Sequence, residues 1–247
     1  MSGHSKWATI KRKKGANDAA RAKVWSKLLR FVEVSAREGG GNLDGNPTLA
    51  TAIQKAKSAS VPNDNIQRAI KRGTGELQGE SYEEVGYEGY ASGGVAVLVS
   101  CLTNNRNRTS QDVRAAFNGH GGKMAEPGSV AWMFEQKGVV ITTGTSEDDV
   151  FLAAADAGAE DVRASGETIE VVTAPDALGA VRDALVGAGI TVESSDLTQV
   201  PKTTLPLDES EAKKVLALVD ALEELDDVQE VYANFDISDD VLESVAS

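Results

Sequence analysis

Apolar residues recur every three or four positions through the first third of the chain, a spacing typical of amphipathic α-helices. Residues 18–40 place their apolar side chains on one broad face, and the closing glycines predict where that helix ends. A second helix is predicted over 46–60, with Asn46 as its N-cap and Pro47 at its first helical position. A third is predicted over 61–73. The pattern therefore predicts a small helical bundle.

After the bundle the pattern changes to alternating and continuous apolar runs, which are typical of strands. We predict strands at 82–90, 95–103 and 129–134, a loop at 104–108, and a helix at 109–122 that is capped by Thr109. This ββα unit has too few strands to form a stable sheet by itself. It is therefore expected to need strands from elsewhere in the chain.

Beyond Gly138 the predicted elements follow the order βαββαβ, which is the ferredoxin-like pattern. The strands are expected at 139–142, 161–164, 168–173 and 190–200, and the helices at 146–158 and 175–189. A helix at 210–225 and a strand at 228–235 follow, without a sheet of their own. We expect this last pair to complete the earlier ββα unit, so that the ferredoxin-like unit is an insertion.

The predicted fold class is multidomain α and α+β: an N-terminal helical bundle plus two α+β domains, one of them ferredoxin-like and inserted in the other. The expected domains are the basic bundle with an N-terminal arm at 1–75, the middle α+β domain at 80–135 together with 203–240, the inserted domain at 136–202, and a tail at 241–247.

Charge is divided unevenly along the chain, whose formal net charge is −13. Residues 1–73 contain 15 Lys and Arg against 5 Asp and Glu, whereas residues 74–247 contain 10 against 33. A basic surface attracts polyanions at long range, and an acidic remainder repels them. We therefore expect the basic third to bind nucleic acid while the rest of the protein is held away from it.

The candidate nucleic-acid-binding residues are Lys and Arg side chains of the arm, of the polar helix faces and of the loop at 104–108. They are Lys6, Lys11, Arg12, Lys13, Lys14, Lys23, Lys27, Arg30, Lys55, Lys57, Arg68, Lys71, Arg72, Arg106 and Arg108. The alternative is that these side chains are only the solvated faces of surface helices. That alternative accounts poorly for three helices and an arm that all carry positive charge. A membrane-surface helix would carry more Trp and Phe. If about six of these side chains neutralise phosphates, log affinity falls with log salt at a slope of roughly −5.

The loop at 104–108 has two interpretations. Its arginines and asparagines offer many hydrogen-bond donors to phosphates or unpaired bases. An Asn-rich turn that caps the following helix would have the same composition. Both interpretations stay open at this stage.

The sequence offers no convergent catalytic constellation. It contains no phosphate-binding P-loop, and the glycines of 73–79 have the wrong spacing for a dinucleotide fingerprint. His4 is expected to contact solvent or a phosphate, His120 the carbonyls of a helix end, and Cys101 the core. We therefore predict no enzymatic activity, no cofactor, no metal site and no small-molecule substrate.

No apolar run reaches the length of a signal peptide or a membrane span, and one cysteine cannot form an intramolecular disulfide. A cytoplasmic protein without a membrane partner is expected.

Five stretches of the sequence resemble the YebC/PmpR family of bacterial regulators, whose mitochondrial relatives are translational activators of cytochrome oxidase subunit I. They are residues 3–14, 39–73, 87–109, 113–138 and 231–237. The match is dense over 2–138 and thin afterwards, apart from the end. Asn104 is a departure, because the family usually has Asp at that position.

The resemblance implies a three-part molecule with the domain order already expected. It also implies one of two roles: a cytoplasmic DNA-binding regulator of transcription, or an RNA-binding, ribosome-associated factor that assists translation. The partner would then be duplex DNA or ribosomal RNA. Most of the candidate residues are Lys and Arg, which bind phosphates, and no helix-turn-helix is evident. Both features favour ribosomal RNA or weakly specific DNA as the partner. A third hypothesis, from a different class, is a protein-interaction scaffold whose acidic domains are the working surface.

Overall fold

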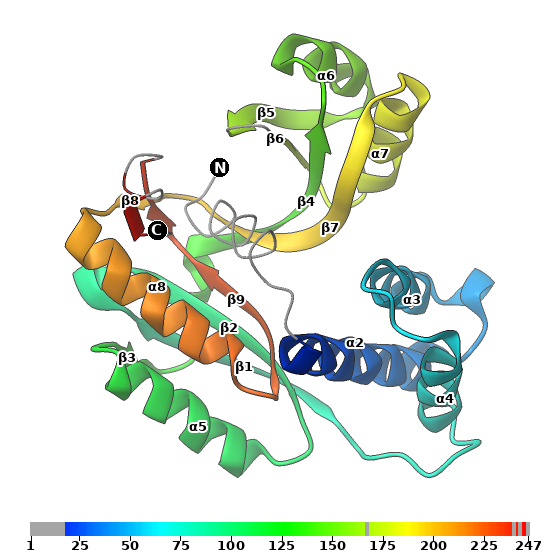
Figure 1. Ribbon diagram of the computed structural model, residues 1–247, viewed down its shortest axis with the longest axis vertical. Helices are drawn as coiled ribbons and strands as arrows, with labels where there is room; N and C mark the ends of the chain where they lie inside the picture. Colours follow the sequence, from blue (N-terminus) through cyan, green and yellow to red (C-terminus); the bar gives the residue numbers. More distant parts are fainter. Residues whose placement is uncertain (1–17, 166–167, 239–240, 242–243, 246–247) are drawn as a thin grey trace.

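The computed structural model describes residues 18–165, 168–238, 241 and 244–245. Figure 1 shows three groups of elements: a helical bundle, a sheet with two helices on one face, and a second sheet with two helices. Two long strands, β4 (Phe134–Thr143) and β7 (Thr191–Pro201), run from the second sheet towards the first. The predicted fold class, a helical bundle plus two α+β units, is confirmed.

The bundle consists of α2 (Asp18–Gly39), α3 (Pro47–Ser58) and α4 (Asn63–Gly73), with a short 3₁₀ turn, η1 (Leu43–Gly45), between the first two. Asn46 caps α3 as predicted, because its side chain accepts a hydrogen bond from the Leu49 N–H at 3.0 Å. Its amide also donates to the carbonyls of Ser35 and Gly40. This one buried side chain therefore joins the start of α3 to the end of α2.

The first sheet has the strand order β3-β1-β2-β9, with all neighbours antiparallel. Its strands are β1 (Glu83–Tyr90), β2 (Ala96–Thr103), β3 (Lys123–Met124) and β9 (Val228–Ala233). The helices α5 (Arg106–Gly119) and α8 (Glu209–Glu223) cover one face and share one hydrophobic core with it. The late strand β9 completes the sheet begun by β1 and β2, as the sequence predicted. The short strands β8 (Leu205–Pro206) and β10 (Phe235–Asp236) pair in parallel beside it.

The second sheet has the order β5-β6-β4-β7, again with antiparallel neighbours. It adds β5 (Ala159–Ser165) and β6 (Thr168–Thr173) to the two long strands, and its helices are α6 (Glu147–Ala154) and α7 (Leu178–Gly187). The connectivity βαββαβ with this strand order is ferredoxin-like, and the unit lies between β3 and β8 in the sequence. The exact domain boundaries predicted from the sequence stay a prediction.

Two local predictions are wrong. The helix expected from Thr109 begins three residues earlier, because Asn105 accepts the Arg108 N–H at 3.1 Å and serves as the N-cap. The strand expected at 129–134 is instead a 3₁₀ turn, η3 (Ala131–Met133), and the strand starts only at Phe134. Backbone N–H groups that a strand would place in a ladder are bound here by the buried carboxylate of Glu88.

Two smaller expectations are met by the geometry. Cys101 is buried in the core of the first sheet, and burial raises the pKa of its thiol to about 12. The His120 ring nitrogen Nδ1 lies 2.9 Å from the Ala116 carbonyl at the end of α5. Ser146 caps α6 by accepting the Asp149 N–H.

None of the helices in the described part of the chain combines the length and the apolar character needed to cross a membrane.

Candidate nucleic-acid interface

Five of the predicted nucleic-acid-binding residues, Lys6, Lys11, Arg12, Lys13 and Lys14, lie outside the described residues. The other ten fall into two groups. Six have partners within the chain, and four extend from exposed positions without an ion pair among residues 18–165 and 168–238.

Lys23 and Lys27 of α2 face the acidic turn, which we define as residues 223–227, from the last residue of α8 to the start of β9. Lys23 Nζ lies 2.9 Å from a carboxylate oxygen of Glu224, and Lys27 Nζ donates to the Glu223 carbonyl at 2.6 Å. Both contacts are at the C-terminal end of α8, where the unpaired carbonyls carry partial negative charge. Burial lowers the pKa of Lys27, against the opposing effect of Glu223. One face of α2 is therefore docked on the middle sheet unit.

Asp227 is the centre of this contact. Its side chain is 6% exposed and accepts from Arg30 at 2.9 Å and from Arg108 at 2.7 Å. The hydroxyls of Thr103 and Thr109 donate to the same carboxylate at 3.1 and 2.7 Å. Burial by itself would raise the pKa of Asp227, but the hydrogen bonds from Arg108 and the threonines outweigh it and hold the pKa below its usual value. Arg108 therefore belongs to a structural junction as well as to the first turn of α5.

A second contact joins the bundle to the inserted unit. Lys55 Nζ of α3 lies 2.8 Å from a carboxylate oxygen of Asp196 on β7. Burial of Lys55 opposes its charged form, but the Asp196 carboxylate outweighs this effect and raises the pKa of the ammonium group. Within the bundle, Arg72 Nε donates to the buried carboxylate of Glu33 at 2.7 Å. Lys55 and Arg72 thus hold elements together.

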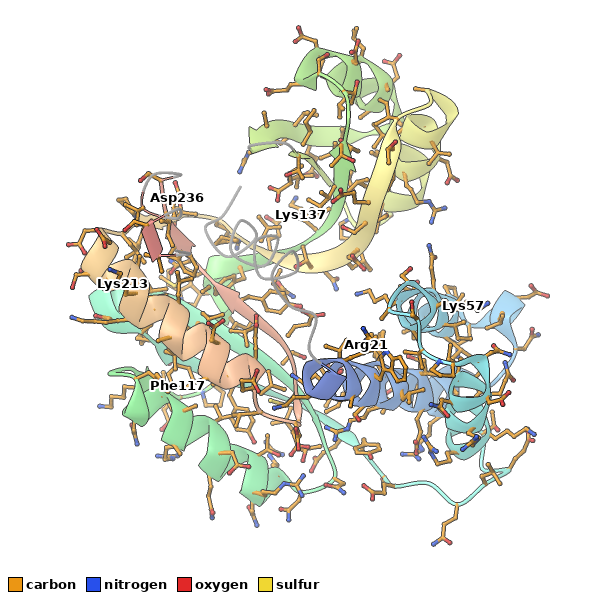
Figure 2. The ribbon with its side chains drawn as sticks, in the orientation of Figure 1. Arg21, Lys57, Phe117, Lys137, Lys213 and Asp236 are labelled. Atoms are coloured by element: carbon orange, nitrogen blue, oxygen red, sulfur yellow. The ribbon has the colours of Figure 1, made fainter. Side chains whose placement is uncertain are left out.

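The outer face of the bundle carries the remaining cations, which we call the bundle cations: Lys57 on α3, and Arg68 and Lys71 on α4. All three are exposed, and none has an ion pair among the described residues. On α4, burial of Ile66 and Ala69 on the opposite side directs Arg68 and Lys71 to solvent. Figure 2 labels Lys57 on α3, at the far side of the molecule from Lys213 on α8.

Arg106 is the fourth candidate that is exposed and has no ion pair among the described residues, and it lies in the first turn of α5. Asn105 caps the helix, which confirms the capping interpretation of the segment 104–108. Arg106 and Asn107 are exposed, and their contact with phosphates or bases stays a prediction. The bundle cations and Arg106 can therefore contact phosphates without breaking any contact that the fold makes.

Sequence reasoning missed the acidic partners Asp227 and Glu33. The periodicity of α2 gives its polar face, but not what lies opposite that face. One signal was present for Glu33, which is a carboxylate in the middle of an otherwise apolar run. Two cations, Arg37 and Arg72, neutralise it in the fold.

Among the described residues, no group of three or more His, Cys, Asp or Glu side chains has the geometry to hold a metal ion. The buried acids Asp227 and Glu88 are bound by arginines, hydroxyls or backbone N–H groups.

Comparison with known proteins identifies the family. Residues 5–76 match the model of the TACO1/YebC protein N-terminal domain, and residues 82–235 match that of the TACO1/YebC second and third domain. Proteins named probable transcriptional regulatory protein from Parafrankia sp. and Salinispora arenicola are 58% and 57% identical to the chain; the first alignment covers all of both chains and the second 98% of each. The crystal structure of a conserved hypothetical protein from Aquifex aeolicus has 47% sequence identity and a TM-score of 0.82, covering 90% of this chain and 93% of that one. The resemblance seen in the sequence is confirmed, and the chain belongs to the TACO1/YebC family.

Proposed function

We propose that this protein is a nucleic-acid-binding regulator of gene expression that acts in the cytoplasm, with duplex DNA as the first candidate partner. Its relatives are named probable transcriptional regulatory proteins, which supports a regulatory role of the same type. The proposed role is one of binding, without a catalysed reaction.

The observation that carries the proposal is the set of bundle cations. Lys57, Arg68 and Lys71 are exposed on one small unit, and their charge is not neutralised by an ion pair within the described part of the chain. Lys and Arg at such positions bind phosphate oxygens and release condensed counterions, which provides most of the affinity for any nucleic acid. The sheet units carry a net negative charge, which weakens backbone contacts there, so the bundle would make the main contact with the duplex.

Ribosomal RNA is the second candidate partner, and the chemistry of the same residues suits it as well as weakly specific DNA. The exposed side chains are phosphate-binding cations, and such contacts position a protein on a backbone without reading its sequence. A translation factor bound to ribosomal RNA needs affinity for a fixed, highly charged site and no base-by-base readout. We expect the two candidates to separate on competition, because a DNA regulator prefers its promoter duplex over random duplex and a ribosomal factor does not.

The experiment compares the binding of labelled promoter duplex, random duplex and a ribosomal RNA fragment by fluorescence anisotropy at low salt. Reversing two bundle cations, Arg68→Glu with Lys71→Glu, is expected to weaken binding about tenfold or more. The matched control is Lys213→Glu with Lys214→Glu, which reverses two exposed cations of α8 and is expected to leave affinity nearly unchanged.

Thermal melting of each variant checks the fold, since exposed charge changes alter stability little. If the wild-type protein binds neither DNA nor RNA at low salt, the proposal is wrong. The scaffold hypothesis, in which the acidic sheet units bind another protein, would then be favoured. If the bundle and control variants lose affinity equally, another surface carries the binding.

A further inference from the structure

Two aromatic side chains on the middle sheet unit are exposed and have no role in the proposed contact of the bundle. Trp132 is 64% exposed and Tyr90 is 36% exposed. Large aromatic side chains are usually packed, since each buries a large apolar area. A single exposed apolar side chain is ordinary, so the case for a site here rests on the pairing of the two rings and on the cation beside them.

The two rings are fixed to one point of the backbone. Tyr90 Oη donates to the Ser129 carbonyl at 3.2 Å, and Trp132 Nε1 donates to the same carbonyl at 3.0 Å. Sharing one acceptor keeps the polar edges of both rings together. The pair is therefore held in place by hydrogen bonds, although it is exposed.

The segment that carries Trp132 is itself anchored by a buried acid. The Glu88 carboxylate accepts the N–H groups of Gly128, Val130 and Ala131 at 2.6, 2.6 and 2.9 Å. These hydrogen bonds outweigh the effect of burial and lower the pKa of Glu88, so the anchor is charged near neutral pH. Val130 is fully buried against the sheet beneath. The aromatic pair is thus presented on an ordered support before any ligand arrives.

A cation lies opposite Tyr90, one residue of the aromatic pair. Lys123 of β3 is the direct cross-strand partner of Tyr90 on β1. Residues opposite each other in an antiparallel ladder point to the same face, so Lys123 and Tyr90 share the face away from α5 and α8. Lys123 is exposed and has no ion pair among the described residues.

We propose that Tyr90, Trp132 and Lys123 form a binding site for an unpaired nucleotide, in which a base stacks on the aromatic rings and Lys123 contacts its phosphate. This inference rests on the proposed function and adds single-stranded nucleic acid to its ligands. Aromatic rings with a neighbouring cation are the combination by which proteins hold single strands irrespective of sequence. A proline-rich peptide would also stack on Tyr and Trp, but it offers no phosphate to the lysine.

The test measures binding of a short oligothymidine and of an oligomer of the same length built from abasic sugar phosphates. The variant Trp132→Ala is expected to bind oligothymidine about tenfold more weakly than the wild-type protein, and the abasic oligomer equally well. Trp132→Phe is expected to restore most of the affinity, since a ring is kept. The control Leu152→Ala truncates a side chain that is 75% exposed on α6 and is expected to change neither affinity.

The readout separates stacking from a loss of structure, because a variant that unfolds would lose affinity for both oligomers. Equal binding of oligothymidine by the wild-type protein and Trp132→Ala would overturn the inference while leaving the proposed function intact. The inference would also be overturned if the fluorescence of Trp132 changed on addition of a proline-rich peptide and not on addition of oligothymidine. Failure of the wild-type protein to bind any nucleic acid would instead overturn the proposed function, and this inference with it.

Discussion

Arg30 and Arg108 share the carboxylate of Asp227, although they come from the bundle and from α5. Arg30 Nη1 lies 2.9 Å from one carboxylate oxygen, and Arg108 Nη2 lies 2.7 Å from the other. Arg30 also donates to the carbonyl of Leu102 at 2.8 Å and lies over the ring of Tyr82, with 4.9 Å to its centroid. The junction therefore ties α2, the end of β2 and the start of α5 to one buried charge.

We predict that Asp227→Asn destabilises the protein by about 3 kcal/mol, since it leaves two guanidinium groups without a counter-charge at a largely buried position. Urea denaturation measures this effect as a lower transition midpoint. The matched control is Asp226→Asn at the neighbouring position, where the side chain is 82% exposed and only faces Lys23 at 3.7 Å. This control is expected to cost less than about 0.5 kcal/mol. Equal effects of the two changes would show that the junction contributes nothing beyond a surface ion pair.

Acid is expected to weaken the same junction. The pKa values of Asp227 and Glu88 are both lowered in the folded protein. In the unfolded chain these groups have pKa values of about 3.9 and 4.3. Because the folded pKa is the lower one, both carboxylates stabilise the fold fully above these values, and the contribution is lost as the pH falls through the folded pKa. We therefore predict that the urea midpoint is nearly constant from pH 7 to about pH 5 and decreases below about pH 4. A decline that is as steep in Asp227→Asn as in the wild-type protein would assign the acid sensitivity to other groups.

The element order of this protein could be predicted from its sequence because each step of it has a local cause. Periodicity, Asn46 before Pro47, and Ser146 before three acids specify helices and their starts within a few residues. The insertion also followed from local reasoning, since two incomplete units flanked one complete βαββαβ pattern. The 3₁₀ turn at Ala131–Met133 could not be found in this way. Its sequence favours a strand, and the acid that binds its N–H groups lies on β1, some 40 positions earlier.

The charge of the candidate site could be predicted from the sequence, but the ion pairs that its cations make within the fold could not. Amphipathic spacing correctly places Arg68 and Lys71 on the solvent side of α4. The same rule places Lys23 and Lys27 on the polar side of α2, but that side faces the acidic turn of a segment about two hundred residues away. Helical periodicity describes one helix, and the contact between distant segments depends on the whole fold. Acids clustered directly after a predicted helix are the one signal that could have indicated such a partner.

The salt dependence of duplex binding tests most directly the claim that the bundle cations bind phosphates. Each phosphate contact contributes about 0.9 to the slope of log affinity against log salt. Neutralising the set with Lys57→Gln, Arg68→Gln and Lys71→Gln is therefore predicted to make the slope shallower by roughly 3. The control Lys202→Gln, Lys213→Gln and Lys214→Gln removes three exposed cations of the sheet units and is predicted to leave the slope unchanged. A bundle variant whose slope equals that of the wild-type protein would contradict the account.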